Sequence, residues 1–497
     1  MNIKQAKDYI KDSVKMYLKK DEDGEYRIPI MRQRPIFLLG APGIGKTAIM
    51  EQIAAELGIA LVSYSMTHHT RQSALGLPFI CHKEFDGMQY DVSEYTMSEI
   101  IASIYDTMEE SGVREGILFL DEINCVSETL APSMLQFLQY KVFGRHRVPD
   151  GWVIVTAGNP PEYNKSVRDF DVVTYDRLRV LEVEADYGAW KIYAQEKGIH
   201  AAILQFLELK KDYFYHIETT IKGRLYVTAR GWEDLSEVIK LAEEEENRVD
   251  ETLVGQFLRN DAIVREFTAY YDLYNKYKKD YHISEILDGR IADSAVERAK
   301  AAAFDERLSL LGMLIDKVQE EIRENMELGD CLGELVAPLK ALQGKEGAQI
   351  SELLEKYGQT KEKQLYSRER AGALSAAEKK KDRYILRFYG EARGELTRQE
   401  GESPFAVVKQ LFDTRVAGMK EETRRIQERL HALFTFVEKA FEEGNEMLIL
   451  VTELTTGKRS AEFISRFGCP DYQRHNEKLM LSERQAQMQK AIAELEV

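Results

Sequence analysis

A chain of 497 residues, 44% of them hydrophobic and 10% aromatic, is too long for one ordinary core, so we expect two or three folded domains. Its 84 acidic and 68 basic residues give a formal net charge of −16, which weighs against a dedicated DNA or RNA motor because phosphate backbones are repelled. The N-terminus is charged every few residues, and no apolar run approaches the roughly 20 residues of a membrane span. We therefore expect a cytoplasmic protein without a membrane segment.

The N-terminal part is predicted to alternate between helices and strands. Apolar residues recur at three- and four-residue steps over residues 3–18, which predicts a first helix. Thr96 and Glu99 are spaced as a capping box for a later helix. The expected strands are Ile36–Leu39, Ala60–Tyr64, Ile117–Leu120, Trp152–Ala157 and Leu178–Val183, and the expected helices are Thr47–Leu57, Met97–Ser111 and a segment around Leu130–Leu138. This alternation is typical of a mostly parallel sheet covered by helices.

An insertion interrupts this pattern before the helix at Met97. Apolar residues alternate on both sides of Asp86-Gly87, and an Asp-Gly pair flanked in this way is a strong turn signal. We therefore predict a β-hairpin inserted in the α/β domain.

The remainder of the chain is predicted to be helical. We expect residues 1–185 to form the first helix and the α/β core, 186–285 a small helical lid, and 286–497 an all-α C-terminal domain of unknown role. The charged zone at 359–383 is interpreted as a solvated helix or linker. Core packing or helix pairing is expected for two apolar faces, one of Ile426, Leu430, Leu433, Phe434, Val437 and Phe441 and one of Leu481, Met488, Ile492 and Leu495.

The strongest chemical signal follows the first strand. The run Gly40-Ala41-Pro42-Gly43-Ile44-Gly45-Lys46-Thr47 fits the pattern GxxxxGK[ST] and leads into a helix through Ala48. Glycines let the backbone N–H groups turn toward phosphates, and the helix N-terminus adds a partial positive charge. Lys46 is placed to reach the β- and γ-phosphates, and Thr47 to ligate Mg²⁺. The cofactors predicted from this loop are ATP and Mg.

Two carboxylates end the strand Ile117–Leu120. Buried apolar strands rarely end in adjacent acids unless these face a site. Asp121 is placed to hold Mg²⁺ directly or through water, and Glu122 to polarise an attacking water as general base. Asn159 ends the next apolar strand in the sequence and could orient that water, although an Asn before Pro is also an ordinary turn former.

Arginines later in the chain are candidates for stabilising transition-state charge. Arg177 precedes the last predicted strand, from which it could reach the nucleotide of a neighbouring subunit, and Arg179 is the competing candidate. Arg230 begins a predicted helix of the lid and could touch the nucleotide from that side, or serve only as a surface ion-pair residue.

Five segments of the chain, within about residues 30–280, resemble the MoxR family of AAA+ ATPases. In chain order they are GAPGIGKT, ILFLDEIN, IVTAGNPP, YDRLRV and TARGWEDL. The resemblance implies a P-loop AAA+ αβα sandwich with the hairpin as the insert of this clade. It also implies sensor 1 at Asn159, the arginine finger at Arg177 and sensor 2 at Arg230. It further implies a homo-hexameric ring with chaperone-like remodelling or maturation of client proteins, often with a von Willebrand factor A domain partner. The segment after about residue 290 carries no such resemblance.

Alternatives to an energy-transducing ATPase are an ATP-gated scaffold that hydrolyses slowly and a DNA-remodelling ATPase, which the acidity disfavours.

His68 and His69 do not favour a metal site, because adjacent residues at a strand end point in opposite directions; residues 65–78 are expected to form a loop or partner contact. The spacing of Cys81, Cys125, Cys331 and Cys469 favours unpaired thiols in a reducing compartment.

Overall fold

The computed structural model describes residues 1–68, 72, 74, 76–163, 167, 170–220, 223–398, 403–442 and 444–479. These residues form two compact units, one of Met1–Ala189 with Leu354–Gly390, and one of Trp190–Leu353 with Glu391–Val497. The further division of the second unit at residue 285 stays a prediction. All four cysteines are free thiols. No helix among the described residues combines the length and low charge needed to cross a bilayer.

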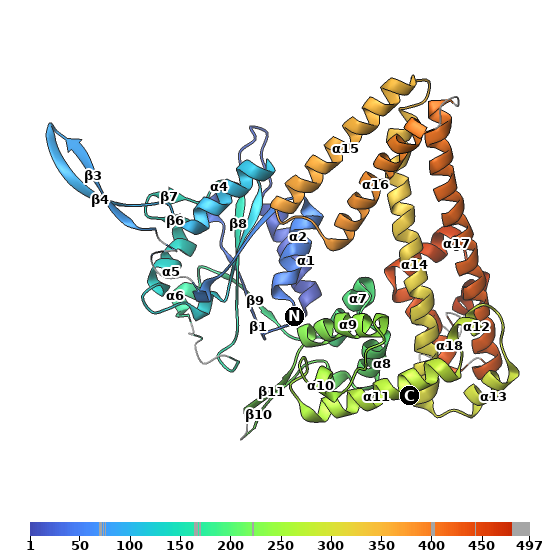
Figure 1. Ribbon diagram of the computed structural model, residues 1–497. Coiled ribbons are helices and arrows are strands. Elements are labelled where there is room, and N and C mark those ends of the chain that lie inside the picture. Colours follow the sequence, from blue (N-terminus) through green and yellow to red (C-terminus); the bar gives the residue numbers. More distant parts are fainter. Residues whose placement is uncertain are drawn as a thin grey trace, which may run out of the picture. The chain divides into compact units, whose positions relative to one another are not determined.

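A five-stranded parallel sheet forms the centre of the first unit (Figure 1). Its order is β2-β5-β8-β1-β9, which places the strand before the glycine-rich loop next to the strand that ends in Asn159. The strands are β1 (Ile36–Gly40), β2 (Ala60–Ser65), β5 (Gly116–Asp121), β8 (Trp152–Gly158) and β9 (Arg179–Val183). All five predicted strands are therefore confirmed, and the central ones are almost wholly buried.

The helices of this unit pack on the sheet. They are α1 (Ile3–Tyr17), α2 (Lys46–Leu57), α4 (Glu99–Ser111), α5 (Ala131–Tyr140) and the short α6 (Val172–Tyr175). The predicted stripe of α1 is confirmed, because Ala6, Ile10, Val14 and Tyr17 are buried. Helix α2 ends at Gly58, whose left-handed φ of 66° closes it as a C-cap.

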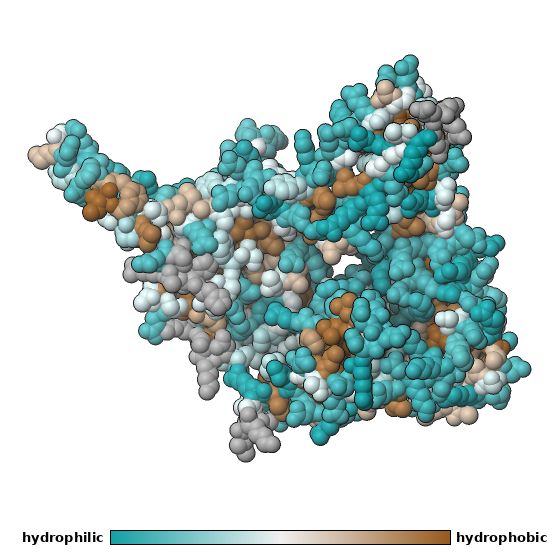
Figure 2. Space-filling model, in the orientation of Figure 1, coloured by the Kyte–Doolittle hydropathy of each residue, from teal (hydrophilic) through white to brown (hydrophobic). Residues whose placement is uncertain are grey.

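The inserted hairpin is confirmed as β3 (Pro78–Phe85) and β4 (Met88–Tyr95), with Asp86 and Gly87 both at positive φ in the turn. It projects from its unit and exposes hydrophobic side chains, among them Ile80, Phe85 and Met88 (Figures 1 and 2). The predicted capping box of Thr96 with Glu99 is wrong, because Glu99 is the first residue of α4 and not the third. Ser98 caps α4 by accepting from the Ile101 N–H at 3.2 Å, whereas the Thr96 hydroxyl accepts from Leu77 N–H at 2.9 Å and closes the base of the hairpin. A second, two-residue-long pairing joins β6 (Val142–Phe143) and β7 (His146–Arg147).

The second unit is mainly helical, as predicted. Its first part contains α7 (Tyr187–Lys197), α8 (Ala201–Leu209), α9 (Ala229–Glu244), α10 (Glu251–Val254), α11 (Asp261–Asp280), α12 (Ile283–Leu287) and α13 (Asp293–Ala301). A hairpin that the sequence analysis missed joins β10 (His216–Thr220) to β11 (Gly223–Val227). Its strands are short and only partly buried, so they lack the apolar runs by which the sheet strands were found.

Two long helices, α14 (Phe304–Lys340) and α17 (Pro404–Phe441), pack together in this unit and are followed by α18 (Asn445–Thr456) and α19 (Lys458–Phe467). The predicted apolar face of α17 is buried at all six positions from Ile426 to Phe441. Residues 470–479 are also helical. The second predicted apolar face, at Leu481, Met488, Ile492 and Leu495, lies outside the described residues.

The charged zone at 359–383 belongs to a pair of antiparallel helices, α15 (Gly347–Arg370) and α16 (Ala376–Arg398), which lie side by side in Figure 1. The rings of Tyr357 and Tyr389 are in tilted contact, with their centroids 6.1 Å apart, and Lys361 pairs with the buried Asp382 at 2.6 Å. The zone is helical as predicted, but it is not solvated throughout. Ala371 and Ala373, in the turn between the helices, are buried in the hydrophobic core of the first unit.

Candidate active site

The glycine-rich loop lies between β1 and α2 at the carboxyl edge of the sheet. Gly40 must be a glycine, because a Cβ there would lie 2.6 Å from the Val183 carbonyl oxygen. Gly45 precedes α2 with a φ of 96°, and no side-chain cap is seen for this helix among the described residues, so its N-terminus is suited to an anion. The predicted nucleotide-binding run therefore has the backbone of a phosphate cradle; it comprises Gly40, Ala41, Pro42, Gly43, Ile44, Gly45, Lys46, Thr47 and Ala48.

Lys46 is buried within this loop. Its ammonium group donates to the carbonyl oxygens of Gly40 at 2.6 Å and Ala41 at 3.0 Å, and to Asn159 Oδ1 at 2.8 Å. Asn159 follows β8, which lies next to β1, so the fold brings together two residues 113 positions apart. A buried charge needs such oxygens around it. Phosphate oxygens could take their place.

Thr47 and Asp121 are also in direct contact. The Thr47 hydroxyl donates to Asp121 Oδ2 at 3.0 Å, and the other oxygen, Oδ1, accepts from the Glu122 N–H at 2.9 Å. Asp121 ends β5, two strands from β1, and both side chains are half-buried. A hydroxyl and a carboxylate at one point are hard oxygen ligands of the kind that Mg²⁺ prefers.

Glu122 adopts an unusual backbone conformation directly after the strand. Its φ of 55° and ψ of 35° lie in the left-handed region, which costs a non-glycine residue about 1–2 kcal/mol. Its Oε2 accepts hydrogen bonds from the Ser65 hydroxyl at 3.0 Å and the Thr67 hydroxyl at 3.1 Å. Such strain is typical of functional sites, where the surrounding structure supports it.

Sequence reasoning missed Ser65 and Thr67. A usable signal was present, since Ser65 ends β2, Thr67 follows it, and β2 pairs with β5, where Ser65 lies opposite Asp121. Hydroxyl residues after a strand that neighbours the acidic one are expected at the same edge of the sheet. They were instead assigned to a loop at 65–78, for which no contacts with the site were predicted.

Asn124 is a second residue that the sequence analysis missed. Its amide donates to the Asn159 carbonyl oxygen at 2.8 Å, and its own Oδ1 is buried without a partner among the described residues. Gly158 allows this contact, because a Cβ there would lie 2.5 Å from Asn124 Oδ1. Asn124 thereby fixes the backbone that carries Asn159.

The donor set fits ATP with Mg²⁺. The loop offers open N–H groups and a glycine cradle, Lys46 offers an ammonium group, and Thr47 with Asp121 offers two oxygens at one point. These residues come from three neighbouring strands, β5, β8 and β1, at the edge where ligands bind in open α/β sheets.

The two competing arginines have different surroundings. Arg179 is half-buried and donates to the hydroxyls of Tyr9 at 2.9 Å and Tyr17 at 3.3 Å, with its guanidinium over both rings. Arg177 is exposed, and its guanidinium donates to Gln139 Oε1 at 2.6 Å. Arg179 is thus committed to holding α1, and Arg177 is the one that a second molecule could reach.

Arg230 is exposed in the first turn of α9, which belongs to the second unit, so its role toward a nucleotide stays a prediction. His69 and the side chain of His68 lie outside the described residues.

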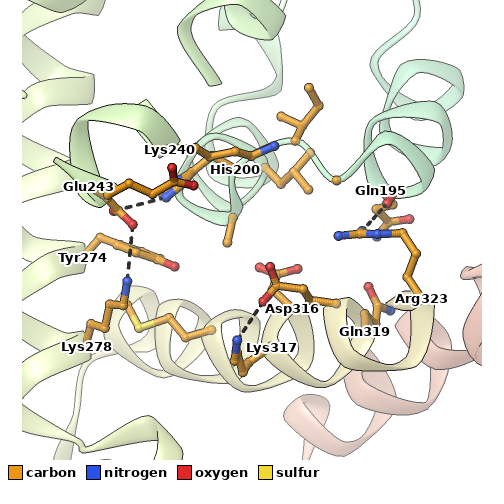
Figure 3. A pocket seen from close by; sticks show the side chains of 17 residues that line it. Gln195, His200, Lys240, Glu243, Tyr274, Lys278, Asp316, Lys317, Gln319 and Arg323 are labelled. Atoms are coloured by element: carbon orange, nitrogen blue, oxygen red, sulfur yellow. Dashed lines mark hydrogen bonds and ion pairs between the residues drawn. The ribbon is translucent and has the colours of Figure 1, made fainter. Parts of the chain in front are cut away.

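A hollow of about 450 Å³ in the second unit contains none of the predicted site residues (Figure 3). Glu243 lies at one side and binds His200 at 3.2 Å, the Tyr271 hydroxyl at 2.8 Å and Lys278 at 3.5 Å. The hydrogen bond from His200 is the main reason that the pKa of Glu243 is lowered to about 2. Asp316 extends from α14 toward the middle, where burial raises its pKa to about 7 although Gln205 donates to it at 3.0 Å.

The fold and this site define a P-loop α/β nucleotide-binding domain. Residues 36–173 match the model of the family described as ATPase family associated with various cellular activities (AAA). The matched segment includes Lys46, Asp121, Glu122 and Asn159, and it supports an AAA+ ATPase with an ATP-dependent activity. No curated protein matches the chain.

Proposed function

We propose that this protein hydrolyses ATP with Mg²⁺ at the carboxyl edge of the first unit's sheet. The observation that carries the proposal is the direct contact of Thr47 with Asp121, at 3.0 Å, beside Lys46 and Glu122. Thr47 and Asp121 are 74 positions apart in the sequence and belong to different elements, α2 and β5. Their meeting next to an open helix N-terminus supports a site for a triphosphate and its metal ion.

Each residue has a defined task in this proposal. Lys46 and the loop N–H groups bind the phosphates, and Thr47 and Asp121 hold the magnesium, which when bound would neutralise charge that develops on the phosphate oxygens. Glu122 takes a proton from the attacking water as general base. The Asn159 amide orients that water, and its attachment to Asn124 keeps the amide in place.

We further propose that the protein acts as a MoxR-like ring, with Arg177 completing the site of a neighbouring copy. The exposure of Arg177 and the commitment of Arg179 to α1 support this assignment. By the resemblance, such a homo-hexamer would remodel or mature client proteins, with a von Willebrand factor A domain protein as partner. The exposed apolar side chains of the β3–β4 hairpin are suited to contacts with another protein.

One observation favours the alternative of an ATP-gated scaffold. Glu122 Oε2 accepts hydrogen bonds from Ser65 and Thr67, and a carboxylate engaged in this way is a poorer general base. ATP turnover would therefore be slow until Glu122 is released. In that case nucleotide binding would assemble the ring and recruit the partner, while hydrolysis would be incidental.

The substitution Glu122→Gln tests both readings. Glutamine keeps the shape and the hydrogen bonds to Ser65 but cannot accept the proton, so we expect turnover to fall by about 10²–10⁴-fold with nucleotide affinity retained. Steady-state ATPase assays and equilibrium binding of a fluorescent ATP analogue measure the two effects. Glu109→Gln, at an exposed position of α4, is the control and should change neither.

Unchanged hydrolysis in Glu122→Gln contradicts the proposed chemistry. A variant that has lost hydrolysis but still supports the cellular task would favour the scaffold.

A further inference from the structure

Strand β2 is at the edge of the five-stranded sheet, and its outer side is covered by the turn between α15 and α16. We name residues 371–375 the tip. The Leu61 N–H, on β2, donates to the Ala371 carbonyl oxygen at 2.7 Å. Exposed strand edges have unpaired N–H groups, and here the tip supplies a partner from a segment 310 positions later in the chain.

The tip has a well-defined backbone. Gly372 takes a φ of 63°, its N–H donates to Glu369 O at 3.1 Å, and the Ala373 N–H donates to Arg368 O at 3.0 Å. These two bonds form a Schellman motif at the end of α15. Ser375 and Glu378 then form a reciprocal capping box that starts α16, with bonds of 3.1 and 3.2 Å. The turn is therefore rigid enough to transmit a displacement.

The tip is also packed tightly against the rest of the first unit, to which it belongs. Ala371 and Ala373 are 0% and 2% exposed and belong to the same core cluster as Val62, Leu118 and Leu120. A Cβ on Gly372 would lie 3.0 Å from the Leu61 carbonyl oxygen, so β2 and the tip are in close contact. At the border of the contact, Arg370 lies 3.6 Å from Glu110, and the Ser367 hydroxyl donates to Ser111 O.

The other end of β2 reaches the proposed general base. Ser65 ends the strand four residues after Leu61, about 13 Å further along an extended chain. Its hydroxyl and that of Thr67 are the groups that bind Glu122 Oε2. A small movement of β2 at the tip thus changes the position of the two hydroxyls that hold Glu122.

Helices α15 and α16 connect this contact to the rest of the chain. Each helix is continuous across the border between the units, α15 between Leu353 and Leu354 and α16 between Gly390 and Glu391. A helix transmits force along its axis because its backbone hydrogen bonds are internal. A rearrangement in the second unit therefore has a direct covalent route to the tip.

We propose that the tip is a positioning element for the ATPase site, which seats β2 so that Ser65 and Thr67 hold Glu122, and that α15 and α16 carry signals from the second unit to it. The proposal rests on the proposed function, since it concerns the base of that reaction. With the tip seated, Glu122 is held and turnover is slow. Displacement of the tip loosens β2 and releases Glu122 toward the attacking water.

The substitution Gly372→Asn tests this. Asparagine tolerates the left-handed conformation better than other side chains, but its Cβ would press on Leu61 O and displace the tip. We expect kcat for ATP to rise about five-fold, the factor of one net hydrogen bond, with the Kd for ATP unchanged. Gly344→Asn is the matched control, because Gly344 has a φ of 77° with nothing within 4 Å of a Cβ, and it should leave both constants unchanged.

A double-mutant cycle separates positioning from general loosening. In the Ser65→Ala/Thr67→Val background Glu122 is already released, so Gly372→Asn should change kcat by less than about two-fold. Equal effects of Gly372→Asn in both backgrounds overturn the proposal, as does an unchanged kcat in a folded variant. Arg370→Glu, which repels Glu110 without altering a buried atom, is a second and milder variant that should raise kcat in the same direction.

Hydrogen exchange distinguishes a failure of this proposal from a failure of the proposed function. Displacement of the tip should speed amide exchange over residues 60–67 in the wild-type background and in Glu122→Gln, whether or not ATP is hydrolysed. Faster exchange without Glu122-dependent turnover would contradict the proposed function. Unchanged exchange in both Gly372→Asn and Arg370→Glu would contradict the positioning role alone.

Discussion

The sheet-edge site of the first unit and the hollow of the second unit both gather charged side chains, but in different ways. At the sheet edge, a lysine comes from the start of α2, whereas an aspartate and a glutamate come from the end of β5. They meet uncharged partners such as Asn159, Thr47 and Ser65. In the hollow, charged and polar side chains pair with one another, as Glu243 does with Lys278 and with the His200 ring.

The difference teaches that the number of charges does not identify a site. Ion pairs in the hollow, such as Lys278 with Glu243, satisfy one another. At the sheet edge, the open N-terminus of α2 and the strained Glu122 are features that packing alone does not require. Perturbed titration marks functional sites only in combination with such geometry, because structural networks also shift pKa values.

The largest expected effect comes from Lys46→Ala. Loss of the ammonium group from the cradle should abolish tight ATP binding and, with it, hydrolysis. The matched change in the hollow, Lys278→Ala, should leave ATP binding as it is. Isothermal titration calorimetry of both variants measures this contrast. If Lys278→Ala weakened ATP binding as much as Lys46→Ala, the hollow and not the sheet edge would be the nucleotide site.

Arg177→Ala is expected to have the next largest effect. An arginine finger stabilises charge only in the transition state, so turnover should fall by about 10³-fold while ATP affinity stays nearly intact. Arg179→Ala is the matched control. It removes the contacts with Tyr9 and Tyr17, so the free energy of unfolding of the first unit should fall, whereas kcat should change little. If Arg177→Ala kept its hydrolysis rate and Arg179→Ala lost it, Arg179 and not Arg177 would be the arginine finger.

Much of the sheet edge could be predicted because its residues are tied to regular elements. A buried strand that ends in a glycine-rich loop, and two more that end in Asp121 and Asn159, have carboxyl ends that must meet at one edge of a parallel sheet. The glycine-rich motif therefore indicated Lys46 and Thr47, and the acidic end of an apolar strand indicated Asp121, without knowledge of the strand order.

What could not be predicted depends on contacts between segments far apart in the chain. The tip was included in a charged zone because Ala371 and Ala373 are small and isolated among polar residues, and nothing in their spacing indicates burial. Ser65 and Thr67 become partners of Glu122 only through the pairing of β2 with β5. The hollow arises from the packing of helices whose charged residues are indistinguishable from surface residues in the sequence.

The smallest expected effect concerns stability in the hollow. Burial raises the pKa of Asp316 to about 7 from an ordinary value of 3.8, so between these values the folded chain holds a proton that the unfolded chain releases. The free energy of unfolding must then fall as the pH rises through this window. The side chain at this position does not titrate in the Asp316→Asn variant, so the free energy of unfolding of this variant, relative to the wild type, should rise by about 1–2 kcal/mol between pH 5 and pH 8. This is less than the full pKa shift implies, because water reaches the hollow.

Urea unfolding of the two proteins at both pH values measures this difference. Asp413→Asn, at an exposed position of α17, is the control and should show no such trend. ATP turnover should stay within about two-fold of the wild type, since a paired network in the second unit contributes to folding and not to the reaction. A loss of turnover in a stable Asp316→Asn variant would break the contrast between the two regions, because the hollow would then take part in catalysis.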